Sequence, residues 1–399
     1  MKKSAQLVVT GLFLLILFGV STMTLLGARS EGASFYEQRN LAAFPSVSKE
    51  GLWTGAYFTQ TETALMEHIY QRERLLKLNT LIQLQLARPV VNNMVVNSDK
   101  LLSYYTHLYW DTTYLKADAA TMADQLAALN RAVEDYGGYF CYLGFPQQTT
   151  YFADHYPDYM ESRLWHTTEI RKNFSEAMED RNLPFINLYQ IYGEQGMPES
   201  YYPETDHHCT MEGAFAAYEV LMDRICRETG RDLPVLTRAD LDFVTLPNPF
   251  LGSSARKLYG LWKTEDQVSL AELKSPIPFR RWDNGTETEA TVFKHPVTND
   301  EQLTYEVYMG GDKGETILRT DRPELPNVLI FGDSFTNIME PLLWTSFNET
   351  RSLDFRHYQE KTLAEYIADY KPDIVICIRD ESVYFDLTGN GNLGYAIEK

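Results

Sequence analysis

The sequence predicts an α/β protein in which helices flank a parallel β-sheet, with a transmembrane helix at the amino terminus and a mostly β insertion. From residue 113 onward, helical periodicity alternates with short apolar strands, an order typical of parallel sheets. Between 231 and 322 this alternation stops, and the chain becomes rich in Pro, Gly, Thr and charged residues with short strand-like runs. No charge occurs from Ser4 to Ala28. These three observations define the fold class.

Length and composition describe a globular protein with an acidic body. The chain has 399 residues, of which 44% are apolar, and a net charge of -19. That length holds one large or two modest domains, each with a packed core. A polyanion would be repelled, so the charge argues against a nucleic-acid partner and against anionic lipid as a ligand of the soluble part.

The uncharged amino-terminal stretch is long enough to span a bilayer, and we expect residues 1–29 to form a membrane anchor. Lys2 and Lys3 precede it and the acidic body follows, so the positive-inside rule places the body on the extracytoplasmic side of the membrane. A cleaved signal peptide is the alternative. The run is long for such a peptide, however, and Leu26-Gly-Ala28 is a poor cleavage site, which favours an uncleaved anchor.

Four further segments follow the anchor. Residues 30–112 are expected to form a membrane-proximal helical segment, with one long helix between Thr59 and Ala87. Residues 113–230 form the first part of the α/β domain, 231–322 an insertion or lid, and 323–399 the second part of the α/β domain. The apolar stripe predicted for the long helix comprises Leu65, Ile69, Leu75, Leu76, Ile82 and Leu86.

The four cysteines, Cys141, Cys209, Cys226 and Cys377, show neither CxxC nor Cys/His metal spacing. We therefore expect a fold that does not depend on disulfides, and neither a metal nor a cofactor.

The stretch from Asn327 to Thr336 carries the strongest signal for chemistry. Four apolar residues end at Gly332, and Asp333 and Ser334 then stand where a helix begins. Such a strand-to-helix turn holds a nucleophile above the carboxyl edge of a sheet, and backbone N–H groups of Gly332 and Asp333 are candidates to hold an oxyanion. The alternative is an ordinary surface turn, since Gly-Asp-Ser alone is a weak motif.

A serine nucleophile needs a base, and the chain offers one cluster, Asp206-His207-His208. The residues alone leave either histidine open as the base. The same three residues would also suit a metal-dependent phosphoesterase, but the other aspartate-rich ligand motifs of such enzymes are missing.

Three segments together resemble a known family. The runs Tyr202–Tyr218, with its Asp-His-His, Leu329–Phe335, with its Gly-Asp-Ser, and Lys371–Ile376 are similar to the DHHW proteins of Gram-positive bacteria. These resemble the alginate O-acetyltransferases AlgJ and AlgX of the SGNH-hydrolase-like superfamily. The resemblance implies a circularly permuted SGNH-like sheet, with Ser334 as nucleophile, His208 as base and Asp206 as its partner, and His207 as the alternative base. The family's tryptophan after the two histidines is Cys209 here.

The resemblance also implies a function. It predicts transfer of acetyl groups onto hydroxyls of a cell-surface or secreted polysaccharide, through an acetyl-serine and beside a membrane-bound O-acyltransferase as acetyl donor. A polysaccharide acetyl esterase with the same triad, or a non-catalytic scaffold of an export complex, are the alternatives.

Further candidates surround these residues. Gly310 or Gly311 is expected to add an oxyanion donor. Arg379 and Tyr202 are candidates for substrate binding, although Arg379 and Glu381 are also consistent with a solvated ion pair. Aromatic side chains that would either stack on sugar rings or simply pack are Trp53, Tyr104, Tyr105, Tyr109, Trp110 and Tyr114.

Overall fold

The computed structural model describes residues 2–27, 32–104, 112–160, 164–395. Within these, the chain divides into two compact units. The first contains residues 1–92 and 256–262, and the second contains 93–255 and 263–399. Each unit is described by itself.

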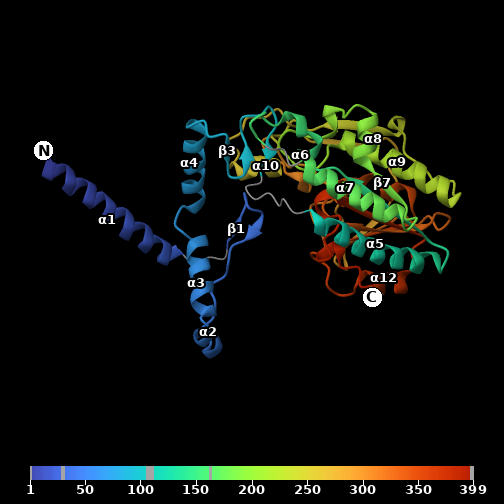
Figure 1. Ribbon diagram of the computed structural model, residues 1–399, viewed down its shortest axis with the longest axis horizontal. Coiled ribbons are helices and arrows are strands. Elements are labelled where there is room, and N and C mark those ends of the chain that lie inside the picture. The colour runs from blue at the N-terminus through green and yellow to red at the C-terminus, as the bar shows by residue number, and fades with distance from the viewer. Residues whose placement is uncertain (1, 28–31, 105–111, 161–163, 396–399) are drawn as a thin grey trace. The chain divides into compact units, whose positions relative to one another are not determined.

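The first unit begins with a long apolar helix, α1, and is mostly helical (Figure 1). Its segment Ser4–Gly27 is long and apolar enough to cross a membrane. At 1.5 Å per residue, its 24 residues extend about 36 Å. The elements of this unit are α1 (Lys2–Gly27), β1 (Ala33–Ser34), β2 (Arg39–Asn40), α2 (Lys49–Thr54), α3 (Ala56–Glu67), α4 (Arg72–Gln85) and β3 (Val90–Val91).

The prediction of one long helix between Thr59 and Ala87 is wrong. Helix α3 ends at Glu67 and α4 begins at Arg72, because Gln71 takes a left-handed conformation with φ 60° that no α-helix can contain. The predicted stripe is also not buried, since Leu75 and Leu86 are at least half exposed. An apolar stripe is buried only where another element covers it, and periodicity alone does not show which element does so.

An eight-stranded sheet organises the second unit. The strand order is β11-β10-β12-β14-β13-β15-β6-β7, and the five strands from β14 to β7 run parallel. The predicted parallel sheet flanked by helices is therefore confirmed. Its strands are β6 (Tyr139–Phe145), β7 (Phe185–Asn187), β10 (Arg280–Asp283), β11 (Thr286–Thr288), β12 (Glu315–Arg319), β13 (Asn327–Gly332), β14 (Glu349–Leu353) and β15 (Ile374–Asp380).

The stretch 231–322 contains β strands, as expected, and part of it belongs to the main sheet. Its strands β10, β11 and β12 extend the main sheet as antiparallel strands beside β14. Its other two strands, β8 (Leu241–Thr245) and β9 (Ser269–Leu273), pair with each other. Two short strands, β4 (Met94–Val95) and β5 (Leu102–Ser103), also pair.

Helices cover both faces of the sheet, and alternate side chains of the central strand contact them. Val328 and Ile330 of β13 pack in a core with α8, α9 and α11, whereas Leu329 and Phe331 pack in a second core with α5, α7 and α12. In Figure 1, α8 and α9 lie on one side and α5 and α12 on the other. The bounds are α5 (Thr113–Glu134), α6 (Gln148–Tyr151), α7 (Leu164–Glu179), α8 (Leu188–Glu194), α9 (Met211–Thr229), α10 (Ser253–Lys257), α11 (Thr336–Leu343) and α12 (Leu363–Tyr370).

Gly332 ends the central strand at a point where no side chain fits. A Cβ atom built on it would overlap the backbone carbonyl of Ile378 on the neighbouring strand β15. Backbone atoms in a sheet cannot move aside as a flexible side chain can, so the close approach of β13 and β15 requires glycine here.

We expect Gly332→Ala to lower the free energy of unfolding by about 3 kcal/mol, because the added methyl group overpacks a buried strand pair. Gly193→Ala is the matched control, since a Cβ there would meet only the end of the Met197 side chain at an ordinary contact distance of 3.7 Å, and alanine favours a helix. Urea unfolding of both variants measures the difference. Equal stability of the two variants would contradict this packing.

Glu340 is a buried acid in α11, the helix that follows the predicted nucleophile. Its carboxyl accepts a hydrogen bond of 2.6 Å from the Ser352 hydroxyl on β14. Burial raises its pKa to about 7, although the Ser352 hydroxyl and the Arg281 guanidinium oppose this shift. Folded protein therefore retains a proton that the unfolded chain releases near pH 4.

The raised pKa of Glu340 links stability to pH. Its contribution is fully present below about pH 4 and is lost as the pH rises toward 7, with a cost on the order of 3 kcal/mol. We expect Glu340→Gln to flatten this part of the pH dependence in unfolding experiments between pH 5 and 8. The exposed Glu360→Gln should leave the slope as it is, and an unchanged slope in Glu340→Gln would disprove the assignment.

Candidate active site

The turn between β13 and α11 holds Ser334 in place. The N–H of Asp333 donates to the Ile378 carbonyl at 3.2 Å, which continues the contact with β15. The Asp333 carboxylate accepts from the N–H groups of Phe335 at 2.9 Å and Asp380 at 2.8 Å. Burial and the nearby Asp380 carboxylate raise the pKa of Asp333. The Asp333 side chain thus ties the nucleophile turn to the end of β15.

Ser334, His208 and Asp206 form one chain of hydrogen bonds. The His208 ring places Nε2 2.7 Å from Ser334 Oγ and Nδ1 2.7 Å from Asp206 Oδ1. Asp206 also accepts from the N–H groups of His208 at 2.9 Å and Ser253 at 2.6 Å. The three side chains predicted from two distant segments therefore lie together at the carboxyl edge of the sheet.

The electrostatics assign the protons in this chain. Burial alone would raise the pKa of Asp206, but the adjacent His208 and the hydrogen bonds outweigh it and hold the pKa well below its usual value. An ionised Asp206 only accepts hydrogen bonds, so His208 Nδ1 carries the proton. In the neutral ring, Nε2 is then free to accept the Ser334 hydroxyl proton, as a general base requires.

His207, the alternative base, has another partner. Its Nδ1 lies 2.6 Å from Ser253 Oγ, and its side chain is half exposed. The Ser334 hydroxyl donates to His208 and not to His207, so the geometry favours His208 in the role of base.

Tyr305 fixes the plane of the His208 ring. The two rings are stacked with centroids 3.6 Å apart and planes 7° apart, and the His207 ring is tilted by 39° against His208 with its centroid at 3.7 Å. Tyr305 lies within 231–322, in a short turn of helix at Tyr305–Val307. Sequence reasoning missed it, because no local motif marks an aromatic residue that reaches a site through tertiary packing.

A small cavity of about 130 Å³ lies beside the base. Its lining includes Asp206, His208, Cys209 and Tyr305. Cys209 stands where the resembled family has tryptophan, and its buried side chain contributes to this wall. All four cysteines of the chain are free thiols.

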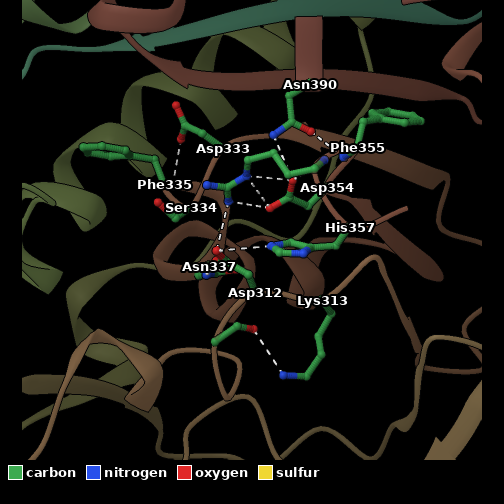
Figure 2. A network of polar contacts seen from close by, with 12 residues as sticks. Asp312, Lys313, Asp333, Ser334, Phe335, Asn337, Asp354, Phe355, His357 and Asn390 are labelled. Carbon is green, nitrogen blue, oxygen red and sulfur yellow. Dashed lines mark hydrogen bonds and ion pairs between the residues drawn. The ribbon is translucent and has the colours of Figure 1, made fainter. Parts of the chain in front are cut away.

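Several of the predicted oxyanion donors are already used by the protein. The N–H of Asp333 binds the Ile378 carbonyl, and the N–H of Gly311 donates to Tyr308 at 3.1 Å. Gly310 and Gly311 form a turn with positive φ, and the Gly310 carbonyl accepts from Lys313 Nζ at 2.8 Å (Figure 2). Gly332 is the last residue of β13 and is still paired with Ile378 of β15 in the sheet.

The N–H of Ser334 itself is better placed to hold an oxyanion. In the described part of the chain it makes no hydrogen bond, while the N–H groups on either side of it are engaged. A donor on the same residue as the attacking oxygen suits an oxyanion that forms on the carbonyl group under attack.

Arg379 and Tyr202 do not present side chains to a substrate in this structure. Both are buried. Arg379 donates to the Asp386 carbonyl at 3.3 Å, and the Tyr202 hydroxyl donates to the Pro146 carbonyl at 2.5 Å. The segment that follows β15 covers this end of the strand. The order of strands and helices in the sequence does not predict this covering.

The prediction of a solvated ion pair between Arg379 and Glu381 is wrong. Glu381 is fully buried and accepts from the Arg171 guanidinium at 2.7 Å instead.

The predicted sugar-stacking aromatics are scattered. Trp53 is 93% exposed but belongs to the first unit. Tyr104 packs against a core of the second unit, and Tyr114 is partly exposed. Tyr105, Tyr109 and Trp110 lie outside the described residues.

Among the described residues, two clusters have the composition of a cation site. One is Asp206, His207 and His208, and the other is Asp312, Asp354 and His357. In the first, hydrogen bonds with Ser253, Ser334 and the backbone already occupy the donor atoms. Protein contacts alone thus explain why Asp206, His207 and His208 lie together. The absence of a metal stays a prediction.

The fold is that of a group of solved α/β proteins. No protein-family model and no curated protein matches the chain. Bacillus cereus PatB1 is 20% identical, with 73% of this chain and 96% of PatB1 aligned and a TM-score of 0.61. A second PatB1 structure, with a sulfonyl adduct, gives a TM-score of 0.58.

A DHHW family protein from Eubacterium siraeum is 17% identical, with 77% of this chain and 97% of that protein aligned and a TM-score of 0.56. The O-acetyltransferase domain of Pseudomonas putida AlgJ is 10% identical over 74% of this chain and 92% of that domain, with a TM-score of 0.47. The expected resemblance to DHHW proteins is thus confirmed for the fold.

We expect Tyr305→Leu to slow the reaction of Ser334 with a sulfonyl fluoride about tenfold, because the ring of His208 loses the surface that orients it. Tyr305→Phe keeps the stacked ring and should react within about twofold of the original protein. Mass spectrometry of the modified protein over time measures both rates. A Leu variant as fast as the Phe variant would show that the stacking has no role.

Proposed function

We propose that this chain is an extracytoplasmic O-acetyltransferase that moves acetyl groups onto hydroxyls of a cell-surface or secreted polysaccharide through an acetyl-serine. The hydrogen-bonded chain from Ser334 through His208 to Asp206 is the observation that carries this proposal. It is the arrangement that activates a hydroxyl for acyl transfer.

In the first half of the reaction, His208 Nε2 takes the Ser334 hydroxyl proton as Oγ attacks the acetyl carbonyl. The Ser334 N–H donates to the oxyanion, and Asp206 stabilises the imidazolium that forms. The bond to the donor's leaving group then breaks, and the leaving group takes the proton from His208. Acetyl-Ser334 remains.

The second half reverses these roles. An acceptor hydroxyl gives its proton to His208 Nε2 and attacks the acetyl carbon, and Ser334 Oγ leaves with that proton. If water attacks instead, the same residues make an acetyl esterase. The triad serves both reactions, so the identity of the acceptor decides between them.

The amino-terminal helix supports a location at the membrane. Its length fits a bilayer, and the two lysines before it, followed by an acidic body, favour an uncleaved anchor with the α/β domain outside. Cytoplasmic acetyl donors do not reach that side. A membrane-bound O-acyltransferase that passes acetyl groups across the bilayer is therefore the proposed donor.

To test the proposal, the full-length protein in detergent is incubated with p-nitrophenyl acetate, digested and analysed by mass spectrometry. We expect an added acetyl group on Ser334 that is absent from Ser334→Ala. His208→Ala should form it at least about 100-fold more slowly, because general-base assistance is lost. His295→Ala, which removes an exposed histidine paired with Glu272, is the matched control and should behave as the original protein.

Two results would overturn parts of this proposal. Acetylation of other residues but never of Ser334 would leave the protein as a non-catalytic scaffold. Release of acetate at the same rate with and without a glycan acceptor, and no acetylated glycan, would make it an esterase.

A further inference from the structure

A cluster of polar side chains beside Ser334 takes no part in the chemistry proposed above. It consists of Asp312, Asp354, Arg356, His357 and Asn390, and is connected to the nucleophile helix through Asn337 (Figure 2). We refer to these five residues as the Arg356 cluster.

The sheet brings the Arg356 cluster to the same edge as Ser334. Strands β13 and β14 are parallel, with Phe331 opposite Leu353, so the residues after each strand leave the sheet side by side. Asn337, one turn beyond Ser334, donates from Nδ2 to Asp312 Oδ1 at 2.7 Å. A ligand held by the cluster would therefore lie next to the nucleophile.

The cluster is rigid before any ligand arrives. The buried Asp354 binds Arg356 Nε with both carboxylate oxygens, at 2.9 and 3.0 Å. Asn390 donates from Nδ2 to Asp354 at 2.9 Å and accepts from the N–H of Phe355 at 2.5 Å. These contacts hold the guanidinium in one position, which lowers the entropy lost on binding.

The accessible groups of the cluster have opposite charges and touch each other. The side chains of Arg356, Asp312 and His357 are 41%, 32% and 52% exposed, and Arg356 Nη2 lies 3.0 Å from Asp312 Oδ2. An anion would have to compete with two carboxylates for the guanidinium. A cation would be repelled by the Arg356 guanidinium, which already neutralises the Asp312 and Asp354 carboxylates. Neither ion is therefore a suitable ligand.

A neutral polyol suits this pair of groups. One hydroxyl of a vicinal diol donates to the Asp312 carboxylate, while its neighbour accepts from Arg356, and charged partners make both hydrogen bonds strong. The exposed imidazole of His357 adds a third polar contact.

We propose that the Arg356 cluster is the acceptor subsite, which binds an uncharged sugar unit through vicinal hydroxyls and presents a further hydroxyl to acetyl-Ser334. This inference rests on the proposed function for its role in the reaction. The inference predicts that a neutral glycan binds more tightly than an anionic one, and this preference can be measured without acetyl transfer.

The test uses the full-length Ser334→Ala protein in detergent, which lacks the nucleophile and therefore reports binding without reaction. Calorimetry compares a neutral N-acetylglucosamine trimer with a galacturonic acid trimer. We expect the neutral trimer to bind at least tenfold more tightly. Asp312→Asn and Arg356→Lys, each added to Ser334→Ala, should weaken the neutral trimer at least tenfold, because each removes or misplaces one charge-assisted hydrogen bond.

The matched control is Arg280→Gln, added to the same background. Arg280 is an exposed arginine paired with Asp321, and the strand register places it opposite Arg319 and hence at the amino edge of the sheet, away from Ser334. This variant should bind as the parent protein does. Thermal unfolding of every variant verifies that it remains folded.

Two kinds of binding result overturn the inference. Tighter binding of the anionic trimer would make the cluster an anion site. Binding of neither trimer, or unchanged binding in the folded Asp312→Asn and Arg356→Lys proteins, would show that the cluster is structural. Failure of the parent chain to form acetyl-Ser334 would reject the proposed function and leave this binding result standing.

Discussion

The hydrogen bond between His208 and Ser334 is the contact on which the rest of the site depends. It joins residues from two segments far apart in the chain, across a distance of 2.7 Å. The parallel sheet makes this possible, because the turn after β13 delivers Ser334 to the carboxyl edge. Asp206 makes it useful, because an ionised carboxylate on Nδ1 leaves Nε2 to accept the hydroxyl proton.

The surrounding residues keep this contact in one geometry. The Asp333 carboxylate ties the nucleophile turn to β15, while Tyr305 stacks on the imidazole from the stretch inserted between the two halves of the sheet. Ser253 binds Asp206 through its N–H and His207 through its hydroxyl. Residues 231–322 thus hold the catalytic histidine in position and also add strands to the sheet.

Sequence reasoning succeeded where the signal is local. The apolar run before Gly332 predicts a buried strand, and Asp206, His208 and Ser334 carry chemistry that their types alone suggest. It did not succeed where tertiary packing decides. The burial of Arg379 depends on the carboxyl-terminal segment, and the role of Tyr305 depends on how the insertion folds. The break at Gln71 depends on one backbone angle that helical periodicity does not reveal.

The central claim is that Ser334, His208 and Asp206 act as one unit. A double-mutant cycle tests it directly, with the rate of Ser334 modification by a sulfonyl fluoride measured in His208→Ala, Asp206→Asn and the double variant. Because Asp206 acts only through His208, the double variant should be about as slow as His208→Ala alone. Two independent losses that multiply in the double variant would contradict the account.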